Sequence, residues 1–163
     1  MSERNTYEEY RPAGADLAPR LRDQEVGRTV VTARIPLSRA DLVAYAGASG
    51  DHNPIHWNER FAREVGLDDV IAHGMLSMGS VLARITEWAA DPGAIVDCRT
   101  RFTAPVVVPD AATGAPDTPT AYLDMAAVVG AIDAEAGIVR LDISVTCGED
   151  TVLGRTQVKV RLA

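Results

Sequence analysis

Cysteines, aromatic residues and long apolar runs are all scarce in this chain of 163 residues. The two cysteines, Cys98 and Cys147, lie in strand-like stretches and make no disulfide framework, so we expect buried free thiols in a reducing compartment. Aromatic residues form 5% of the chain, which gives no indication of an aromatic-lined pocket. No apolar run approaches the roughly 18 residues of a membrane-spanning helix. The 47% of hydrophobic residues are therefore expected to fill the core of one domain.

Positive charge is in the minority as well. The formal net charge is −7 and the chain lacks a basic stripe, which argues against nucleic acid as a partner. The stretch from Met1 to Asp23 is polar and charged, which fits neither a secretory signal nor a transit peptide. We expect residues 1–22 to form a polar arm, residues 23–163 to form the folded domain, and the protein to be cytoplasmic with no membrane partner.

Secondary-structure signals change in character along the chain. Thr29–Leu37 is rich in β-branched residues and predicts a strand, and Ser38 predicts the N-cap of a helix after it. Asn58 predicts the cap of a second, short helix, and the apolar run Gly74–Ala90 predicts the longest helix. Four antiparallel strands are predicted from alternating apolar residues over Ile95–Pro105, Ala121–Ile132, Ile138–Cys147 and Val152–Leu162. The order predicts an α+β fold in which the sheet wraps around the long helix.

The run from Asp51 to His56 suits neither a helix nor a strand. Pro54 cannot donate a backbone hydrogen bond, and it moves Asn53 away from helical angles. We therefore expect an ordered, irregular loop to present Asp51 and His56. A carboxylate and an imidazole that converge on one proton are suited to acid–base chemistry, because histidine titrates near neutral pH. The residues alone leave a second interpretation open, in which Asp51 caps a turn and His56 is a half-buried structural imidazole.

His73 and Gly74 stand at the start of the longest predicted helix. The first amides of a helix have no intrahelical partner and carry partial positive charge, so the Gly74 N–H is suited to stabilising an oxyanion. Glycine also lets a substrate carbonyl approach closely. The alternative is that Gly74 only begins the helix. We expect His73 to be a structural neighbour of the site rather than a catalyst.

Two other kinds of site are disfavoured. His52 and His56 are four residues apart, as in helical zinc sites, but Pro54 undermines the helix that would place both on one face. We therefore expect no metal and no other cofactor. The chain also lacks the Gly-x-Ser-x-Gly motif of a nucleophilic serine, and Ser77 and Ser80 are expected to be packing residues.

These residues carry a resemblance to a known family. The run Tyr45-Ala-Gly-Ala-Ser-Gly-Asp-His-Asn-Pro-Ile-His56 resembles the hydratase-2 motif of MaoC-like (R)-specific enoyl hydratases, and Ile71-Ala-His-Gly-Met-Leu76 resembles the second block of that family. Asp91-Pro-Gly-Ala94 and Arg101-Phe-Thr-Ala-Pro105 are similar to the catalytic subunit of actinobacterial (3R)-hydroxyacyl-thioester dehydratases. The resemblance extends from about residue 23 to residue 163.

The resemblance implies a hot dog fold, in which an overhang segment carries the active site and covers an acyl tunnel. It also implies pairing with a second hot dog subunit, as a homodimer or a heterodimer. The implied reaction is the reversible hydration of trans-2-enoyl thioesters of coenzyme A or acyl carrier protein to (3R)-hydroxyacyl thioesters. The implied site comprises a catalytic dyad, a supporting residue, a backbone oxyanion donor and two substrate-binding residues, which are in that order Asp51 with His56, Asn53, Gly74, and His73 with Met75.

Three alternatives remain beside this reaction. Thioester hydrolysis on the same fold is disfavoured by the intact motif from Asp51 to His56. A non-catalytic subunit that shapes a partner's tunnel is disfavoured because both residues are retained. A specialised hydratase of secondary metabolism stays open, because residues 1–22 and the long loop Pro109–Thr120 depart from the compact relatives.

Overall fold

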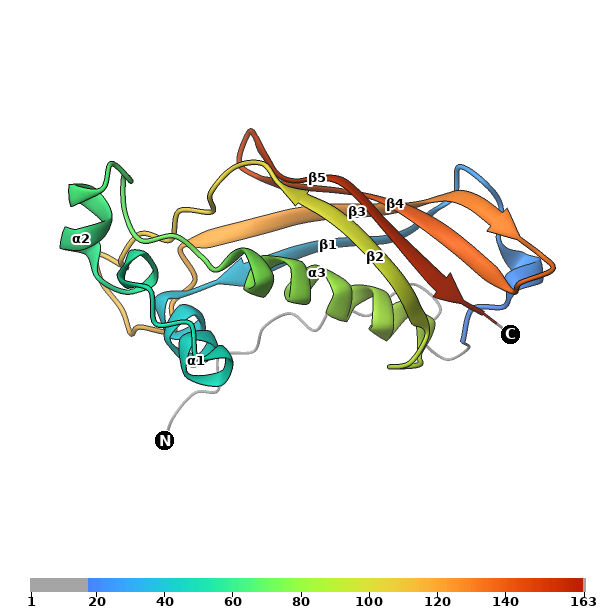
Figure 1. Ribbon diagram of the computed structural model, residues 1–163, viewed down its shortest axis with the longest axis horizontal. Coiled ribbons are helices and arrows are strands. Elements are labelled where there is room, and N and C mark those ends of the chain that lie inside the picture. Colours follow the sequence, from blue (N-terminus) through green and yellow to red (C-terminus); the bar gives the residue numbers. More distant parts are fainter. Residues whose placement is uncertain (1–17, 163) are drawn as a thin grey trace.

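The computed structural model describes residues 18–162, so residues 1–17 of the predicted arm lie outside the described part of the chain. Its main feature is a five-stranded antiparallel sheet with the strand order β1-β3-β4-β5-β2 (Figure 1). The strands are β1 (Thr29–Leu37), β2 (Ile95–Phe102), β3 (Ala121–Asp133), β4 (Ile138–Cys147) and β5 (Asp150–Arg161). The helices are α1 (Arg39–Ser49), α2 (Glu59–Glu64) and α3 (Gly74–Ala89), with short 3-10 turns η1 (Leu21–Asp23) and η2 (Pro54–His56).

The centre of the sheet is a meander of β3, β4 and β5. Apolar and polar residues alternate along these strands, so every second side chain is buried on the face toward α3. Gly137 and Gly148 adopt the left-handed region, with φ of 67° and 61°, in the two turns of the meander. These two turns connect β3 to β4 and β4 to β5. β5 begins at Asp150 rather than at Val152, because Asp150 pairs with Cys147 across a two-residue turn.

Helix α3 lies along one face of the sheet, and α1 and α2 gather near one end of it (Figure 1). The α3 residues that contact the sheet recur every fourth position and are fully buried, namely Ser77, Val81, Ile85 and Ala89. Leu76, Met78, Leu82 and Trp88 of α3 are only partly buried, and Met75 and Ala83 are exposed. The α+β hot dog fold is confirmed, although within this chain the sheet covers one side of the helix and does not surround it.

The predicted caps of the two shorter helices are present. The Ser38 side chain accepts a hydrogen bond from the Asp41 amide, and the Asp41 carboxylate accepts one from the Ser38 amide, which forms a complete capping box. The Asn58 side chain accepts from the Phe61 amide at the start of α2. α1 continues through Gly47 to Ser49 and ends at Gly50, which has a φ of 75°. Local side-chain chemistry therefore sets where both helices start.

Two details differ from the sequence-based expectation. β2 ends at Phe102 and not at Pro105, because the following segment leaves β5 and pairs instead with the chain before α3, where Val107 forms a bridge with Ile71. Cys98 and Cys147 lie in strands as expected and are free, but both are only partly buried. No helix within residues 18–162 combines the length and the apolar character needed to cross a membrane.

Candidate active site

His56 ends the 3-10 turn η2 and is 7% exposed. Its Nδ1 lies 2.7 Å from the Ile71 carbonyl oxygen. A carbonyl oxygen only accepts hydrogen bonds, so Nδ1 carries the proton and donates it. In the neutral ring Nε2 is therefore an unprotonated acceptor. This tautomer is the one that a general base acting through Nε2 requires.

Ile71 holds the imidazole because it is itself fixed on two sides. Its amide donates to the Ile55 carbonyl, beside His56, at 3.1 Å. Its neighbours pair with the segment after β2, since the Ala72 amide donates to the Val106 carbonyl at 2.8 Å and Val107 forms a bridge with Ile71. The orientation of His56 is thus linked through backbone hydrogen bonds to the edge of the sheet.

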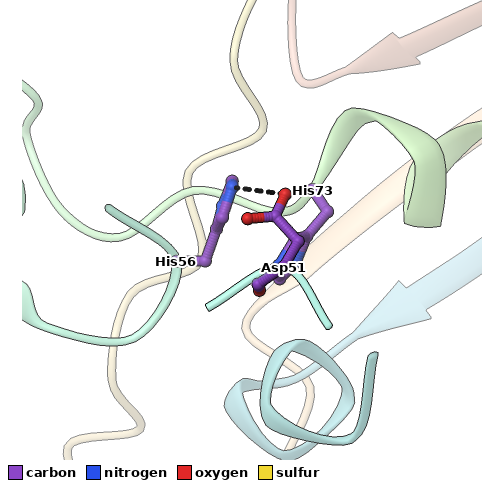
Figure 2. A group of neighbouring side chains, drawn as sticks. All are labelled: Asp51, His56 and His73. Atoms are coloured by element: carbon purple, nitrogen blue, oxygen red, sulfur yellow. Dashed lines mark hydrogen bonds and ion pairs between the residues drawn. The ribbon is translucent and has the colours of Figure 1, made fainter. Parts of the chain in front are cut away.

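Asp51 faces the free nitrogen of His56. Its Oδ2 lies 4.0 Å from His56 Nε2 (Figure 2). Its Oδ1 accepts a hydrogen bond from the Asn53 amide at 3.2 Å. The Asp51 side chain is 54% exposed, whereas that of His56 is 9% exposed. The gap of 4.0 Å is longer than a hydrogen bond, so the two groups are placed to share a water or a substrate proton rather than to neutralise each other.

The surroundings of His56 favour its neutral form. Burial lowers the pKa of His56 below its ordinary value of 6.5, and the hydrogen bond to the Ile71 carbonyl opposes this change. His73 lowers the pKa of His56 further, and the Asp51 carboxylate raises it. The net direction is downward, so the imidazole is unprotonated and able to accept a proton at neutral pH.

A cavity of about 340 Å³ opens beside His56 and Gly74. Gly74 is the first residue of α3, so its amide belongs to the group that lacks an intrahelical partner and carries partial positive charge. A Cβ atom at this position would lie 2.9 Å from the Phe102 ring, so glycine is required by close packing. The cavity wall consists largely of apolar residues and backbone from β5 and the segment after β2, including Phe102, Thr103, Pro105, Val152 and Leu153.

The remaining predicted site residues lie in different positions. Asn53 accepts from the Ile55 amide with its side chain and caps η2, so it shapes the loop rather than the cavity. His73 is 2% exposed and stacks on His56, with ring centroids 3.7 Å apart (Figure 2). Met75 is 52% exposed and does not belong to the cavity wall. The structure thus brings together Asp51, His56, His73 and Gly74.

Asp51, His56 and His73 also form the kind of cluster that can hold a metal ion, with their ligand atoms within 4.8 Å of one another. The two rings are inclined by only 23° and stacked, so their in-plane lone pairs run side by side. A cation about 2.1 Å from a nitrogen of each ring would lie far outside both ring planes. One nitrogen of each ring is also bound to a backbone carbonyl. The donor set therefore fits a metal poorly.

A buried ion pair fixes the segment that leads into this site. Arg39 Nη2 lies 2.6 Å from Asp69 Oδ1, and Arg39 Nε donates to the Val108 carbonyl at 2.6 Å. The side chains of Arg39 and Asp69 are 17% and 11% exposed. The pair joins α1 to the chain two residues before Ile71. Sequence reasoning missed this pair, because Arg39 and Asp69 are 30 positions apart and neither belongs to a motif.

Sequence reasoning also assigned no role to Ile71 or to the cavity wall. Ile71 contributes its backbone carbonyl, and a backbone contact cannot be predicted from the type of side chain. Phe102 and Pro105 lie in the run Arg101–Pro105, which was noted as similar to a family motif. This similarity was the feature of the sequence from which the cavity wall could have been predicted.

Comparison with known proteins adds the family. A family model described as MaoC like domain matches residues 22–115. The 3-hydroxybutyryl-CoA dehydratase of Methylorubrum extorquens is 31% identical over 140 residues, which are 85% of this chain and 82% of that protein. The (R)-specific enoyl-CoA hydratase of Rhodospirillum rubrum is 41% identical over 78 residues, which are 47% of this chain and 54% of that protein. Both names describe hydro-lyases.

Solved structures agree on the fold. A protein described as a MaoC-like dehydratase superposes with a TM-score of 0.82 and 32% identity; the match covers all of this chain but about half, 51%, of the other. One chain of the ChsH1-ChsH2 complex from Mycobacterium tuberculosis has a TM-score of 0.72 at 16% identity, over 86% of this chain and 99% of the other, a likeness that shows the fold alone. The family model includes more than half of this sequence, and the chain belongs to the MaoC-like domain family.

Proposed function

We propose that this chain catalyses the reversible addition of water to a trans-2-enoyl thioester, giving a (3R)-hydroxyacyl thioester, without a cofactor. The observation that carries the proposal is that His56 lies next to both of the other two groups, Asp51 and Gly74. The free Nε2 of His56 faces Asp51 at 4.0 Å, and His56 shares a cavity with Gly74, the first residue of α3. A base, a carboxyl group and an oxyanion donor are the parts that this addition needs.

The proposed steps follow from the chemistry of the thioester. Its carbonyl makes the β-carbon electrophilic, and water held between Asp51 and His56 attacks that carbon while His56 Nε2 accepts one water proton. The electron pair of the double bond moves to the thioester oxygen, where the Gly74 amide and the N-terminus of α3 stabilise the enolate. His56 then passes this proton to the Asp51 carboxylate, and Asp51 delivers it to the α-carbon as the enolate returns to the thioester. Dehydration retraces these steps, so each group is acid in one direction and base in the other.

The relatives support the reaction class but leave the substrate open. One relative is named for a 3-hydroxybutyryl-CoA substrate and another for an (R)-specific enoyl-CoA substrate. We extend acyl-thioester chemistry to this chain, with coenzyme A or acyl carrier protein as the carrier. The half-exposed Asp51 leaves one side of the dyad uncovered, which favours pairing with a second hot dog subunit, as in the ChsH1-ChsH2 complex.

The decisive experiment follows the absorbance of the conjugated enoyl thioester with purified protein and trans-2-enoyl-CoA of several chain lengths. We expect the band to disappear, and we expect Asp51→Asn and His56→Ala each to lower kcat by roughly a hundredfold to ten-thousandfold, the range for a positioned acid or base. His52→Ala is the matched control, because His52 is an exposed histidine of the same loop. Normal turnover in both dyad variants would refute the assignment.

The same assay separates the alternatives. Release of free thiol at the rate of band loss would indicate thioester hydrolysis in place of hydration. A folded chain that is silent with every coenzyme A ester, and becomes active only with an added hot dog subunit, would indicate a heterodimer. Light scattering on the purified chain gives the subunit number that each result requires.

A further inference from the structure

His73 contacts both members of the dyad from outside the Asp51–His56 loop. Its ring stacks on that of His56, with centroids 3.7 Å apart and an interplanar angle of 23°. Its Nε2 lies 3.1 Å from the Asp51 carbonyl oxygen. Figure 2 shows the three side chains gathered at one point, with His73 behind Asp51 and alongside His56. His73 is also the N-cap residue of α3, so it is fixed to the helix whose first amide lines the cavity.

The hydrogen bond to Asp51 shows which nitrogen of the His73 ring carries a proton. The Asp51 carbonyl only accepts, so His73 Nε2 carries the proton and donates it. In the neutral ring Nδ1 is then an acceptor, and this atom is buried without a hydrogen-bond partner. An unpartnered buried polar atom costs stability. A phenylalanine would avoid this cost and still stack, and a glutamine would still donate. Of these three side chains, only the imidazole both stacks on His56 and donates to Asp51.

We propose that His73 is a positioning residue, which sets the separation of Asp51 and His56 by holding the backbone of one and the ring plane of the other. The catalytic significance of this role rests on the proposed hydratase reaction, whereas the two contacts can be tested without it. Tyr45 of α1 also contacts His73, since the centroids of the two rings are 4.8 Å apart. His73 does not need to touch the substrate in order to act.

The proposal has a pH-dependent consequence. The titratable groups that face His56 are Asp51 on its own loop and His73 at the start of α3, and Tyr45 of α1 follows behind His73. The segments Ile71–Ala72 and Phe102–Val106, which line the same cavity, contribute backbone and uncharged side chains. Charge repulsion from the protonated form of His73 lowers the pKa of His56, so a residue that cannot carry this charge should raise that pKa. The acidic limb of kcat/KM should then move to higher pH.

Two variants separate the two contacts. His73→Phe keeps a stacking ring and loses the donor, whereas His73→Gln keeps a donor and loses the ring. We expect each to lower kcat by roughly tenfold to a hundredfold, the scale of an ångström-sized misplacement, with little change in KM. Both should shift the acidic limb upward. His52→Gln, at the exposed histidine of the same loop, is the matched control and should change neither quantity.

Nitrogen NMR of the imidazoles tests the geometry without any substrate. In the wild-type protein we expect the proton on Nδ1 of His56 and on Nε2 of His73, and a His56 titration that moves to higher pH in both variants. The opposite tautomers, or a His56 titration unaffected by both variants, would overturn the proposal even if a variant failed to fold. A rise in KM alone would also overturn it, by making His73 a substrate contact. Absence of turnover in wild type with the expected tautomers would count against the proposed function only.

Discussion

The sheet and the segment that carries the proposed dyad differ in the balance of the forces that stabilise them. In the sheet, stability comes from apolar side chains such as Leu123, Leu141 and Val158, each of which is fully buried. In residues 38–73, which we call the overhang, apolar side chains such as Leu42 and Val70 also join the core, and polar side-chain contacts, with backbone and with each other, add to this burial. Examples are the Ser38 capping box, the Asn53 turn and the buried Arg39–Asp69 pair.

The difference shows how one small domain combines a sheet that tolerates substitutions with a loop whose geometry is fixed. A buried apolar face accepts many sequences of similar volume, because the hydrophobic effect is not directional. A hydrogen-bonded loop accepts few, because each contact needs one donor and one acceptor at a set distance and angle. The dyad requires a separation of a few ångströms, and it lies in the part of the molecule whose contacts are directional.

The largest expected effect comes from breaking the buried pair of the overhang. Asp69→Leu removes the nearest carboxylate of Arg39 and leaves Glu59 Oε2 at 3.6 Å, so we expect a loss of about 3 kcal/mol in the free energy of unfolding, the lower end of the range for a broken buried pair. Leu141→Ala in the sheet should cost a similar 2–5 kcal/mol through its cavity. Urea unfolding measures both. If the comparison is right, Asp69→Leu also lowers kcat in the protein that remains folded, and Leu141→Ala does not.

A control and a rescue sharpen this test. Glu64→Leu removes one partner of the exposed Arg60–Glu64 pair, whose side chains are 82% and 60% exposed, and should change stability by about 0.5 kcal/mol or less. Arg39→Met combined with Asp69→Leu should restore stability, because a buried ion pair is often replaceable by apolar residues. Restored stability with normal kcat would show that the pair does not position the site.

An intermediate effect is expected where the helix start meets the sheet. In Gly74→Ala the new methyl group lies 2.9 Å from the Phe102 ring, and we expect a cost of about 1–3 kcal/mol together with a loss of turnover. Phe102→Ala in the same chain should remove the clash and recover stability. Turnover should stay low, because the methyl group still lies beside the oxyanion donor. Full recovery of kcat in the double variant would show that the ring, and not the amide, limits activity.

The smallest expected effect is a pH dependence of stability that belongs to the overhang. The pKa of His56 in the folded protein lies below its ordinary value of 6.5, so the unfolded chain binds more protons between these two values. Stability should therefore fall as the pH decreases through this window and stay constant above it. His56→Gln should flatten this part of the profile in urea unfolding at a series of pH values. An unchanged slope would mean that His56 does not lose a proton on folding.

The sheet could be predicted from sequence because its signals are local and repeated. Alternation placed β4 at Ile138–Cys147 without error, and Ser38 and Asn58 announced the helices that they cap. The predicted end of β2 was too late, because the conformation of Thr103–Val107 depends on its pairing with the distant segment at Ile71. Pairing between segments so far apart cannot be recognised from ten neighbouring residues of the sequence.

The candidate site could be predicted only in part, for the same reason. Asp51, His56 and Gly74 stand out by residue type and spacing, and in the structure His56 faces Asp51 and lines one cavity with Gly74. The contacts that orient them come from a backbone carbonyl at Ile71, from a buried pair that spans 30 positions, and from a stacked ring at His73. None of these contacts follows from a local sequence pattern, since each joins segments that only the folded structure brings together.

The strand order has a consequence for how the chain folds. β3, β4 and β5 follow one another through short turns, so their pairings close small loops. The edge strands join over much greater distances: Arg34 of β1 meets Asp124 across 90 positions, and Thr100 of β2 meets Thr156 across 56. Loop-closure entropy grows with the length of chain enclosed. The edge that supplies Phe102 to the cavity is therefore among the parts of the sheet whose formation costs the most chain entropy.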